Sequence, residues 1–303
     1  MTQFTELVRR NMRIYLRDKG AVFFSLLSML IVIALMLFFL GDMNIEAITD
    51  MLGKLPGRDA EADRKNAELM VLLWTCAGII SINAVTVTLA ALSSMIKDKT
   101  SGKINSIYTA PVSRLKISAA YICSACLSSV IVCGITLAIT EIYCVIQGAE
   151  PFSFVSHLAL LGMIIVNSFA YSAIMYLVAA AAKTEGAWSS IGTIIGTLVG
   201  FLGGIYLPLG TLGNEIATGM KCLPVIYGTS MFRVIMTEDI LAKTFEGAPQ
   251  EMLSEYSEAM GIKLNAFSFE VSPLGGVIIL GVCGIICLFI GVALTSKARK
   301  TDR

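Results

Sequence analysis

Residues 21–40 read AVFFSLLSMLIVIALMLFFL, a run of twenty residues without a charge. At a rise of ~1.5 Å per residue, a helix of this length crosses the roughly 30 Å hydrocarbon core of a bilayer. The run is too long for the apolar core of a signal peptide, and the GDMNIE that follows offers no small-residue cleavage site. We therefore interpret it as a retained membrane anchor, with a cleaved signal as the alternative.

Similar apolar runs recur along the rest of the chain. They cover residues 69–95, 117–146, 155–182, 187–209 and 275–296. The mean hydropathy is +0.78 and only 15% of the residues are charged. This pattern predicts an all-α integral membrane protein in which six spans form a single transmembrane domain over residues 1–303.

Charges are divided unevenly between the segments that connect these spans. The N-terminus, residues 96–116, Lys183 and the C-terminal tail hold 15 of the 23 basic residues and 5 of the 22 acidic ones. Residues 41–68, 141–154 and 208–274 hold the other 8 basic and 17 acidic residues. Because loops rich in lysine and arginine stay in the cytoplasm, we predict that both termini and the 96–116 loop are cytoplasmic. An even number of spans agrees with this orientation.

Three segments outside the spans carry recognisable patterns. Residues 1–19 separate apolar side chains from arginines, which predicts a helix lying on the inner membrane surface, with a frayed basic tail as the alternative. In residues 208–274, glycines and Pro224 interrupt the first half, which favours two short helices re-entering the outer leaflet over surface coil. Residues 249–260 form an apolar stripe and predict an external helix that caps the bundle or a second subunit.

The spans also contain small and polar residues at helical spacing. Span five carries glycines at four-residue intervals, namely Gly192, Gly196, Gly200 and Gly204. Glycine lets helices approach closely in lipid, so this stripe marks either a subunit interface or pathway wall, or packing within one subunit. The polar side chains of spans two and five include Asn83, Thr86, Thr193 and Thr197. They either line a cavity or hydrogen-bond between helices.

Reactive side chains are sparse. Glu141 is expected near the outer end of its span, where it has either a local or a transport role. His157, the only histidine, is interpreted as an interfacial side chain, and the eight cysteines as packing residues without a metal. The sequence has no phosphate-binding loop and no HExxH motif, and it has no carboxylate pair at a span centre. We therefore assign no catalytic residue, no cofactor and no metal to this chain, and no nucleic-acid partner.

The basic loop contains DKTSGKINSIYTAPVSRLKI, which resembles the loop after the second span of type-2 ATP-binding-cassette (ABC) transporter permeases. The matching positions are Gly102, Ile107, Pro111, Val112, Ser113 and Arg114. In that family the loop forms a coupling helix that sits in a groove of a cytoplasmic ATPase subunit. Thr100 and Asn105 stand where the family commonly has glutamates, so the contact with the ATPase would be less acidic here. A loop that only fixes topology is the alternative.

A second stretch, FLGGIYLPLGTLGNEIATGMKCLPVIYGTSMFR, is similar to the family's segment after span five. The matching positions are Gly204, Pro208, Leu212, Leu223, Pro224, Tyr227 and Arg233. One departure is Gly213, where the family often has a second proline. The two matches and the order of spans together extend over nearly the whole chain.

The resemblance implies a permease subunit of an ATP-driven exporter in the plasma (inner) membrane. It would work as a homodimer, or with a related permease, together with two separately encoded ATPase chains that carry ATP and Mg. Spans two and five would line the pathway. The apolar walls suit drugs, lipids and peptides equally well. The alternative from another class is a polytopic membrane enzyme or a scaffold without an ATPase partner.

Overall fold

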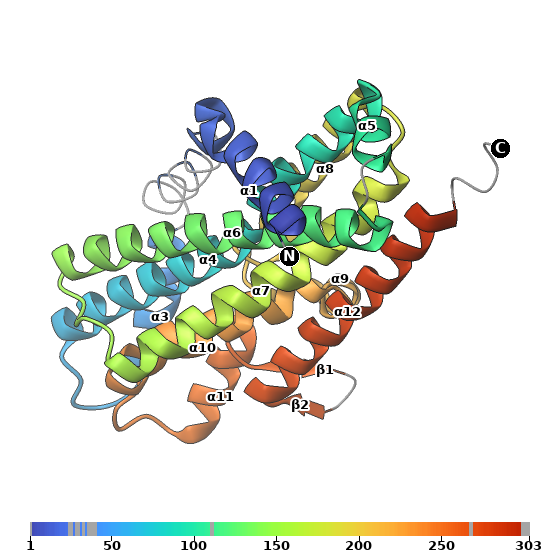
Figure 1. Ribbon diagram of the computed structural model, residues 1–303. Helices are drawn as coiled ribbons and strands as arrows, with labels where there is room; N and C mark the ends of the chain where they lie inside the picture. The colour runs from blue at the N-terminus through green and yellow to red at the C-terminus, as the bar shows by residue number, and fades with distance from the viewer. Residues whose placement is uncertain are drawn as a thin grey trace.

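The computed structural model describes residues 2–23, 27, 31, 34, 41–109, 112–266 and 269–297. Most of the predicted first span and Pro111 therefore lie outside the described residues. The elements follow one another as in Figure 1: α1 (Thr2–Arg17), α3 (Gly41–Leu52), α4 (Ala60–Thr100), α5 (Lys103–Thr109), α6 (Arg114–Ile146), α7 (Phe154–Ala181), α8 (Glu185–Leu202), η2 (Leu209–Thr211), α9 (Asn214–Lys221), α10 (Pro224–Thr244), α11 (Gln250–Ala259), β1 (Leu264–Ala266), β2 (Phe269–Val271) and α12 (Pro273–Lys297).

Four of these helices, α4, α6, α7 and α12, are long and apolar enough to cross a membrane. This confirms the predicted all-α membrane protein, with one addition: β1 and β2 form a small antiparallel hairpin that pairs Leu264 with Val271. The predicted count of six spans stays a prediction, because four helices among the described residues qualify. The predicted fifth span is α8, an 18-residue helix that ends before Gly203 and is not one of the four.

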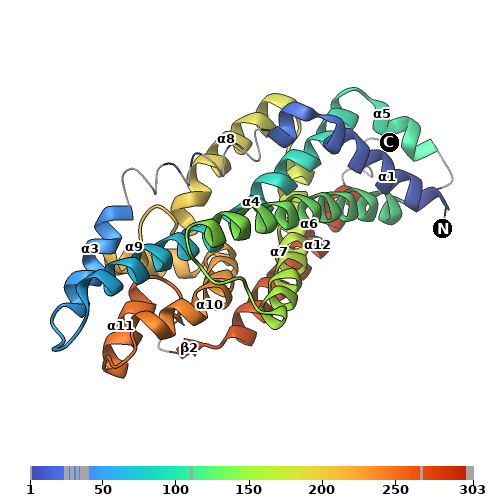
Figure 2. The ribbon, with the colours of Figure 1, turned by 90° about the vertical axis from the view of Figure 1, so that its left-hand side faces the viewer.

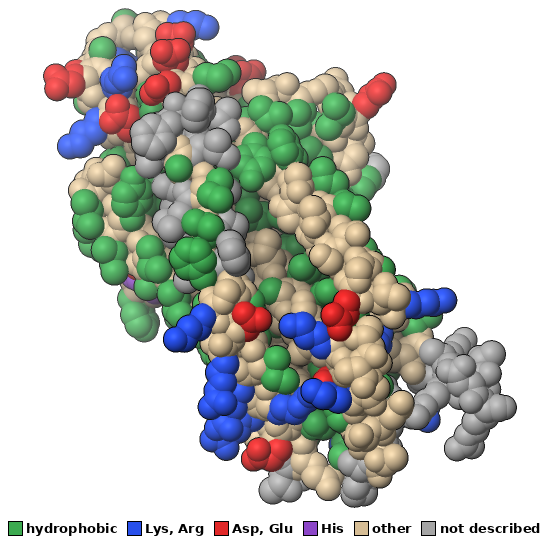
Figure 3. All heavy atoms as spheres, turned by 90° about the horizontal axis from the view of Figure 1, so that it is seen from above, with side chains coloured by type: hydrophobic (Ala, Val, Ile, Leu, Met, Phe, Trp, Pro, Cys, Tyr) green, Lys and Arg blue, Asp and Glu red, His purple; other side chains and the backbone are tan. Residues whose placement is uncertain are grey.

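The two ends of the bundle carry different elements. Figure 2 shows α1 and α5 at one end and α3 and α11 at the other. We call these the α5 end and the α11 end. Basic side chains gather at the α5 end, acidic and basic ones mix at the α11 end, and hydrophobic side chains are abundant between them (Figure 3). This division is the one expected for a protein that crosses a bilayer.

Helix α4 forms the centre of the bundle. It contacts α6, α7 and α10 along its length, and also α1, α3, α5 and α8. Its side chains from Leu69 to Met95 are mostly buried, because apolar and small residues occupy every face of the helix. Its 41 residues extend over ~60 Å, about twice the hydrocarbon thickness, so both ends project beyond the membrane core.

Hydrogen bonds between buried polar side chains join α4 to its neighbours. The Asn83 amide donates to Thr136 of α6 at 2.7 Å, and the Asn167 amide of α7 donates to the carbonyl oxygen of Ser81 at 3.0 Å. The hydroxyls of Ser129 and Ser168 link α6 and α7 at 2.8 Å. In lipid no water replaces such partners, so these bonds fix which helix faces meet.

Two helices, α9 and α10, occupy the stretch of the predicted pair, and α10 is longer than predicted, a continuous helix of 21 residues that begins with Pro224. Their entry into the outer leaflet stays a prediction. Pro224 occupies the first turn, where its missing N–H is not needed. Gly228 does not break the helix. A Cβ at Gly228 would lie 2.6 Å from Oδ1 of Asn167 and 3.0 Å from the Ser81 hydroxyl, so glycine allows α10 to pack closely against α4 and α7.

Helix α1 has the amphipathic character predicted for residues 1–19. Val8, Asn11 and Tyr15 are buried against the bundle, whereas Arg9 and Arg13 are exposed. Its neighbours are α6 and α4. Its position on a membrane surface stays a prediction.

Helix α12 packs on α7 through glycine and faces outward with large apolar side chains. A Cβ at Gly284 would lie 2.8 Å from the Cα of Ala170, and one at Gly291 would lie 2.9 Å from the ring of Tyr176. On the other side of α12, Ile278 and Phe289 are more than half exposed. Lipid tails are the medium that such a surface matches.

We expect Gly284→Leu to separate α12 from α7 and to destabilise the protein by about 1–3 kcal/mol, since the larger side chain has no space there. Gly281→Leu is the matched control, because a Cβ at Gly281 meets nothing within 4 Å. Thermal unfolding of the purified variants in detergent checks this. Equal midpoints for the two variants would contradict the packing described here.

Candidate functional site

The predicted coupling segment contains a short helix that is largely exposed. Gly102, with a φ of 73°, turns the chain between α4 and α5, and only glycine adopts this conformation without strain. On α5, Ile104 is buried and Ile107 is partly buried against the bundle, whereas Lys103, Asn105 and Ser106 are exposed. The apolar side of α5 is therefore attached to the bundle while its polar side faces outward.

After α5, Val112 packs partly buried against the bundle and Ser113 precedes the first turn of α6. Arg114 is exposed at the start of α6. Of the six residues predicted to couple to an ATPase, five thus lie together at the α5 end, and Pro111 falls outside the described residues.

A buried carboxylate holds the last turn of α4 at this end. Asp98 is 4% exposed. It accepts two hydrogen bonds from the Arg10 guanidinium of α1, at 2.7 and 2.8 Å, and one from the Tyr121 hydroxyl of α6 at 2.6 Å. The hydrogen bonds to Asp98 raise the pKa of Arg10 above its ordinary value, so this pair stays charged.

The two residues after Asp98 connect α4 to two further helices. The Lys99 ammonium donates to the carbonyl oxygen of Ala179, near the end of α7, at 2.9 Å. This position suits a cation, because the C-terminus of a helix carries partial negative charge. The Thr100 hydroxyl donates to Glu185 of α8 at 2.7 Å.

We call Arg10, Asp98, Lys99, Thr100 and Tyr121 the brace. Through it, three consecutive residues of α4 bind α1, α6, α7 and α8 immediately before the Gly102 turn into α5. The turn into α5 therefore follows directly on a point where α4 is bonded to four other helices.

The predicted pathway residues do not share one surface within a single chain. Asn83 is buried and points to α6, and the Thr86 hydroxyl bonds back to the Asn83 carbonyl oxygen at 3.1 Å. Thr193 and Thr197 are exposed on α8, and each bonds to a carbonyl oxygen of its own helix. The start of α8 contacts α4, where the indole N–H of Trp188 donates to the Ser93 hydroxyl at 2.9 Å.

The four glycines of α8 and its turn have different surroundings. A Cβ added at Gly192 would lie 3.2 Å from the Leu89 side chain of α4, whereas one added at Gly196 would meet nothing within 4 Å. Gly200 lies against the Tyr206 ring, and Gly204, with a φ of 64°, turns the chain after the helix. The stripe is thus a close contact at two positions and an unoccupied surface at Gly196.

Arg233 of the predicted outer segment is fully buried and binds two turns to α4. Its guanidinium donates to the carbonyl oxygens of Gly204 at 2.7 Å and Met260 at 3.1 Å, and it stacks 3.9 Å from the centre of the Trp74 ring. The Trp74 indole donates to the same Met260 oxygen at 2.7 Å. Arg233 therefore ties the turn after α8 and the turn after α11 to the central helix.

The other predicted residues of this segment lie at the ends of its helices. Pro208 precedes η2, Leu223 precedes α10 and Pro224 begins it, and the Tyr227 hydroxyl donates to the Lys221 carbonyl oxygen of α9 at 2.7 Å. They fix the path of the chain from α8 to α10.

Glu141 and His157 form a local pair at the α11 end of α6 and α7. Glu141 Oε2 lies 2.9 Å from Nε2 of His157, and Glu141 Oε1 accepts the backbone N–H of Phe152 at 3.2 Å. These contacts hold the α6–α7 connection. Among the described residues, no three His, Cys, Asp or Glu side chains gather as metal ligands would.

Comparison with known families matches the ABC-2 type transporter model to residues 2–237. The chain belongs to the ABC-2 type transporter family. A search of curated proteins finds no match. The matched range includes the whole brace, α5 and Arg233, and α11, the hairpin and α12 follow it. The protein is thus a membrane component of an ABC-2 transporter, a permease subunit that is not itself catalytic.

Sequence reasoning on this permease missed the brace. Asp98 is the single acid beside five basic residues in the 96–116 loop, and Arg10 is one of several N-terminal arginines, so neither residue is conspicuous in the sequence. The missing information was their partnership, which joins residues 88 positions apart.

We expect Asp98→Asn to destabilise the permease by about 1–3 kcal/mol, because a neutral amide loses the charge-assisted bonds to Arg10 and Tyr121. Arg10 is partly exposed, with 35% of its side chain accessible, so water recovers part of the loss. Thermal unfolding in detergent, with Glu6→Gln on the exposed side of α1 as control, measures the difference. If Arg10→Gln adds its full separate effect to Asp98→Asn, the two residues are not coupled and the brace is wrong.

Proposed function

We propose that this chain is the passive, membrane-spanning half of an ATP-driven exporter, and that two separately encoded ATPase subunits bind at the α5 end. The observation that carries the proposal is the position of α5: a polar helix, exposed on one side, attached directly to the braced end of the central helix. The family supports the arrangement, since its membrane components work with ATP-binding subunits.

The orientation follows from charge. The α5 end carries the basic residues of α1 and of the loop around α5, and loops rich in lysine and arginine are retained in the cytoplasm (Figure 3). Both termini are then cytoplasmic, and α3 and α11 face outward in the plasma membrane. An ATPase in the cytoplasm reaches α5 only in this orientation.

The brace provides a route for mechanical force. When the ATPase subunits close on ATP and Mg, they would push on the exposed side of α5, and the Gly102 turn would pass the displacement to the last turn of α4. Because Asp98, Lys99 and Thr100 bind four other helices there, these helices would move with α4 as a unit. Packed helices transmit such a displacement because they resist compression.

A second copy of the permease, or a related one, completes the pathway in this proposal. On α8, Ile194, Leu198 and Phe201 are exposed beside Thr193, Thr197 and the open position at Gly196. Small residues next to apolar ones form close helix contacts in lipid. The polar threonines would then line the space between two subunits, through which an amphipathic or hydrophobic cargo such as a drug, lipid or peptide leaves the cell.

Reversing the charge on the exposed side of the coupling segment tests the ATPase contact. We expect Lys103→Glu with Arg114→Glu to reduce copurification of the ATPase from native membranes by roughly tenfold. An ATPase surface that is complementary to this basic segment is acidic, and it would repel the two new carboxylates. Lys54→Glu, at the opposite end, is the control. Full recovery of the ATPase with the double variant, at unchanged thermal stability, would refute the contact.

A bulky residue at Gly196 tests the subunit contact. The single chain has room for a leucine there, so we expect Gly196→Leu to fold normally but to reduce the dimeric fraction several-fold, because the side chain holds the two helices apart. The same substitution at Gly281, on the outward side of α12, should leave the dimer intact. Light scattering after chromatography in detergent distinguishes the two. An undiminished dimer for Gly196→Leu places the interface elsewhere.

A further inference from the structure

Arg233 carries a buried charge that no side chain of the described residues neutralises. Its guanidinium is fully buried, and none of the ion pairs among the described residues includes it. The carbonyl oxygens of Gly204 and Met260 and the ring of Trp74 hold it in place, but they offer only partial negative charge. Burial lowers the pKa of Arg233 to about 9, so the side chain is still charged at neutral pH.

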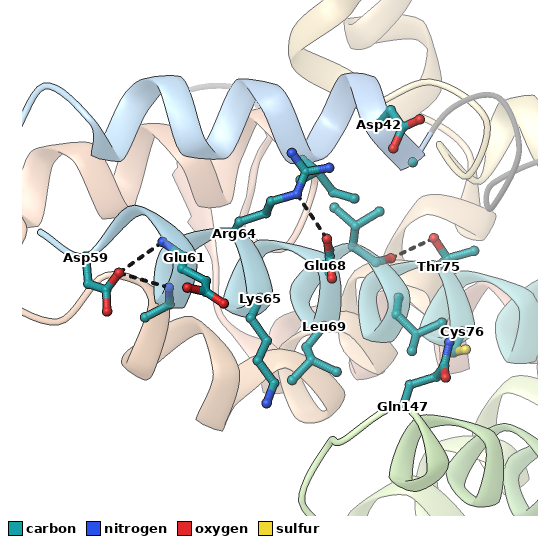
Figure 4. Close-up of a pocket in the computed structure, with 15 residues that line it drawn as sticks. Asp42, Asp59, Glu61, Arg64, Lys65, Glu68, Leu69, Thr75, Cys76 and Gln147 are labelled. Atoms are coloured by element: carbon teal, nitrogen blue, oxygen red, sulfur yellow. Dashed lines mark hydrogen bonds and ion pairs between the residues drawn. The ribbon is translucent and has the colours of Figure 1, made fainter.

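The carboxylates of the first half of α4 are directed elsewhere. Asp63 and Glu68 each bind an arginine of their own region, at 2.6 and 3.3 Å. Glu61 lies on the wall of a pocket of about 800 Å³ that is formed by α3, α4 and Gln147, and Arg233 does not line that pocket (Figure 4). The helix that carries Trp74 therefore supplies no counter-charge.

Other parts of the chain do not supply one either. The acidic side chains of α10 and α11 are all exposed, whereas Arg233 is buried. Residues 24–40, 110–111 and 267–268, which contain the internal gaps between the described residues, include no aspartate or glutamate. A buried charge without a counter-charge is costly, so an ion from solution is the natural partner for this guanidinium.

A second polar group near Arg233 also lacks a partner. Tyr256 of α11 is 5% exposed. Neither its hydroxyl nor the Nε–H of Arg233 has a hydrogen-bond partner in the part of the chain that the structure describes. The two side chains are neighbours, because each acts on the pKa of the other. Burial raises the pKa of Tyr256, so its phenol is an uncharged donor at neutral pH and not the counter-charge.

We propose that a chloride ion binds beneath α11, between the Nε–H of Arg233 and the hydroxyl of Tyr256. An anion accepts both donors and also neutralises the guanidinium, whereas a water molecule leaves the charge unpaired. Trp74 and Arg233 are fully buried, so the site is enclosed, which favours a monatomic ion over a larger anion.

The ion completes the joint through which Arg233 ties the turns after α8 and α11 to α4. Its binding requires no ATPase and no particular membrane orientation. The inference therefore goes beyond the proposed function, and the two can fail separately.

Thermal unfolding of the full chain in a neutral detergent, without an ATPase, tests the site. We expect the midpoint to be about 2–4 °C higher in sodium chloride than in sodium gluconate at the same ionic strength, because a ligand that binds only the folded state stabilises it. Bromide should replace chloride, and sulfate should not. Equal midpoints in chloride and gluconate overturn the proposal.

Tyr256→Phe removes one of the two donors and should reduce the chloride shift by roughly half or more. Tyr227→Phe is the matched control, because the Tyr227 hydroxyl donates to the Lys221 carbonyl oxygen instead. This variant should unfold at a lower temperature in both salts and keep the full difference between them. A chloride shift of full size in Tyr256→Phe overturns the proposal.

Anomalous diffraction from crystals grown in sodium bromide locates the ion directly and does not depend on the folding of a variant. We expect a bromide peak in contact with Nε of Arg233 and the Tyr256 hydroxyl. A water molecule at that position, with bromide only on the surface of the protein, overturns the proposal.

Discussion

The carboxylate of Asp98 is the point on which the α5 end of the molecule depends. A buried charge is costly unless it is paired, and Asp98 is paired at once with a guanidinium from α1 and a phenol from α6. Lys99 and Thr100 extend the same joint to α7 and α8. These bonds fix the last turn of α4, next to the turn into α5, to four neighbouring helices.

The need to pair a buried charge also organises the α11 end, where the charge belongs to Arg233. This guanidinium has no carboxylate beside it among the described residues. It is held by two carbonyl oxygens and the face of Trp74. Two turns that are distant in sequence are therefore fixed to one side of α4. The central helix thus has one polar anchor at Trp74 and another at its last turn, with glycine contacts and hydrogen-bonded serines, threonines and asparagines between them.

The sequence predicted those features that depend on local pattern. Apolar length located α4, α6, α7 and α12, and the apolar stripe of residues 249–260 located α11, which covers Gln250–Ala259. Partnerships were harder to predict. Glycines predict interruptions in residues 208–274, but a single sequence does not show that Asn167 lies against Gly228 and makes it a packing residue. Nor does it decide whether Asn83 lines a cavity or bonds to another helix. The coupling and pathway roles of the predicted residues stay predictions.

The central claim is that α5 contacts the ATPase and that the brace carries its motion to α4. Photo-crosslinking in native membranes tests it most directly, with a photoreactive amino acid placed at Ser106, on the exposed side of α5. The account predicts a crosslinked product that contains an ATPase with a phosphate-binding loop, and no such product from the same amino acid at Glu255 of α11. An ATPase crosslink at Glu255 but not at Ser106 would contradict it.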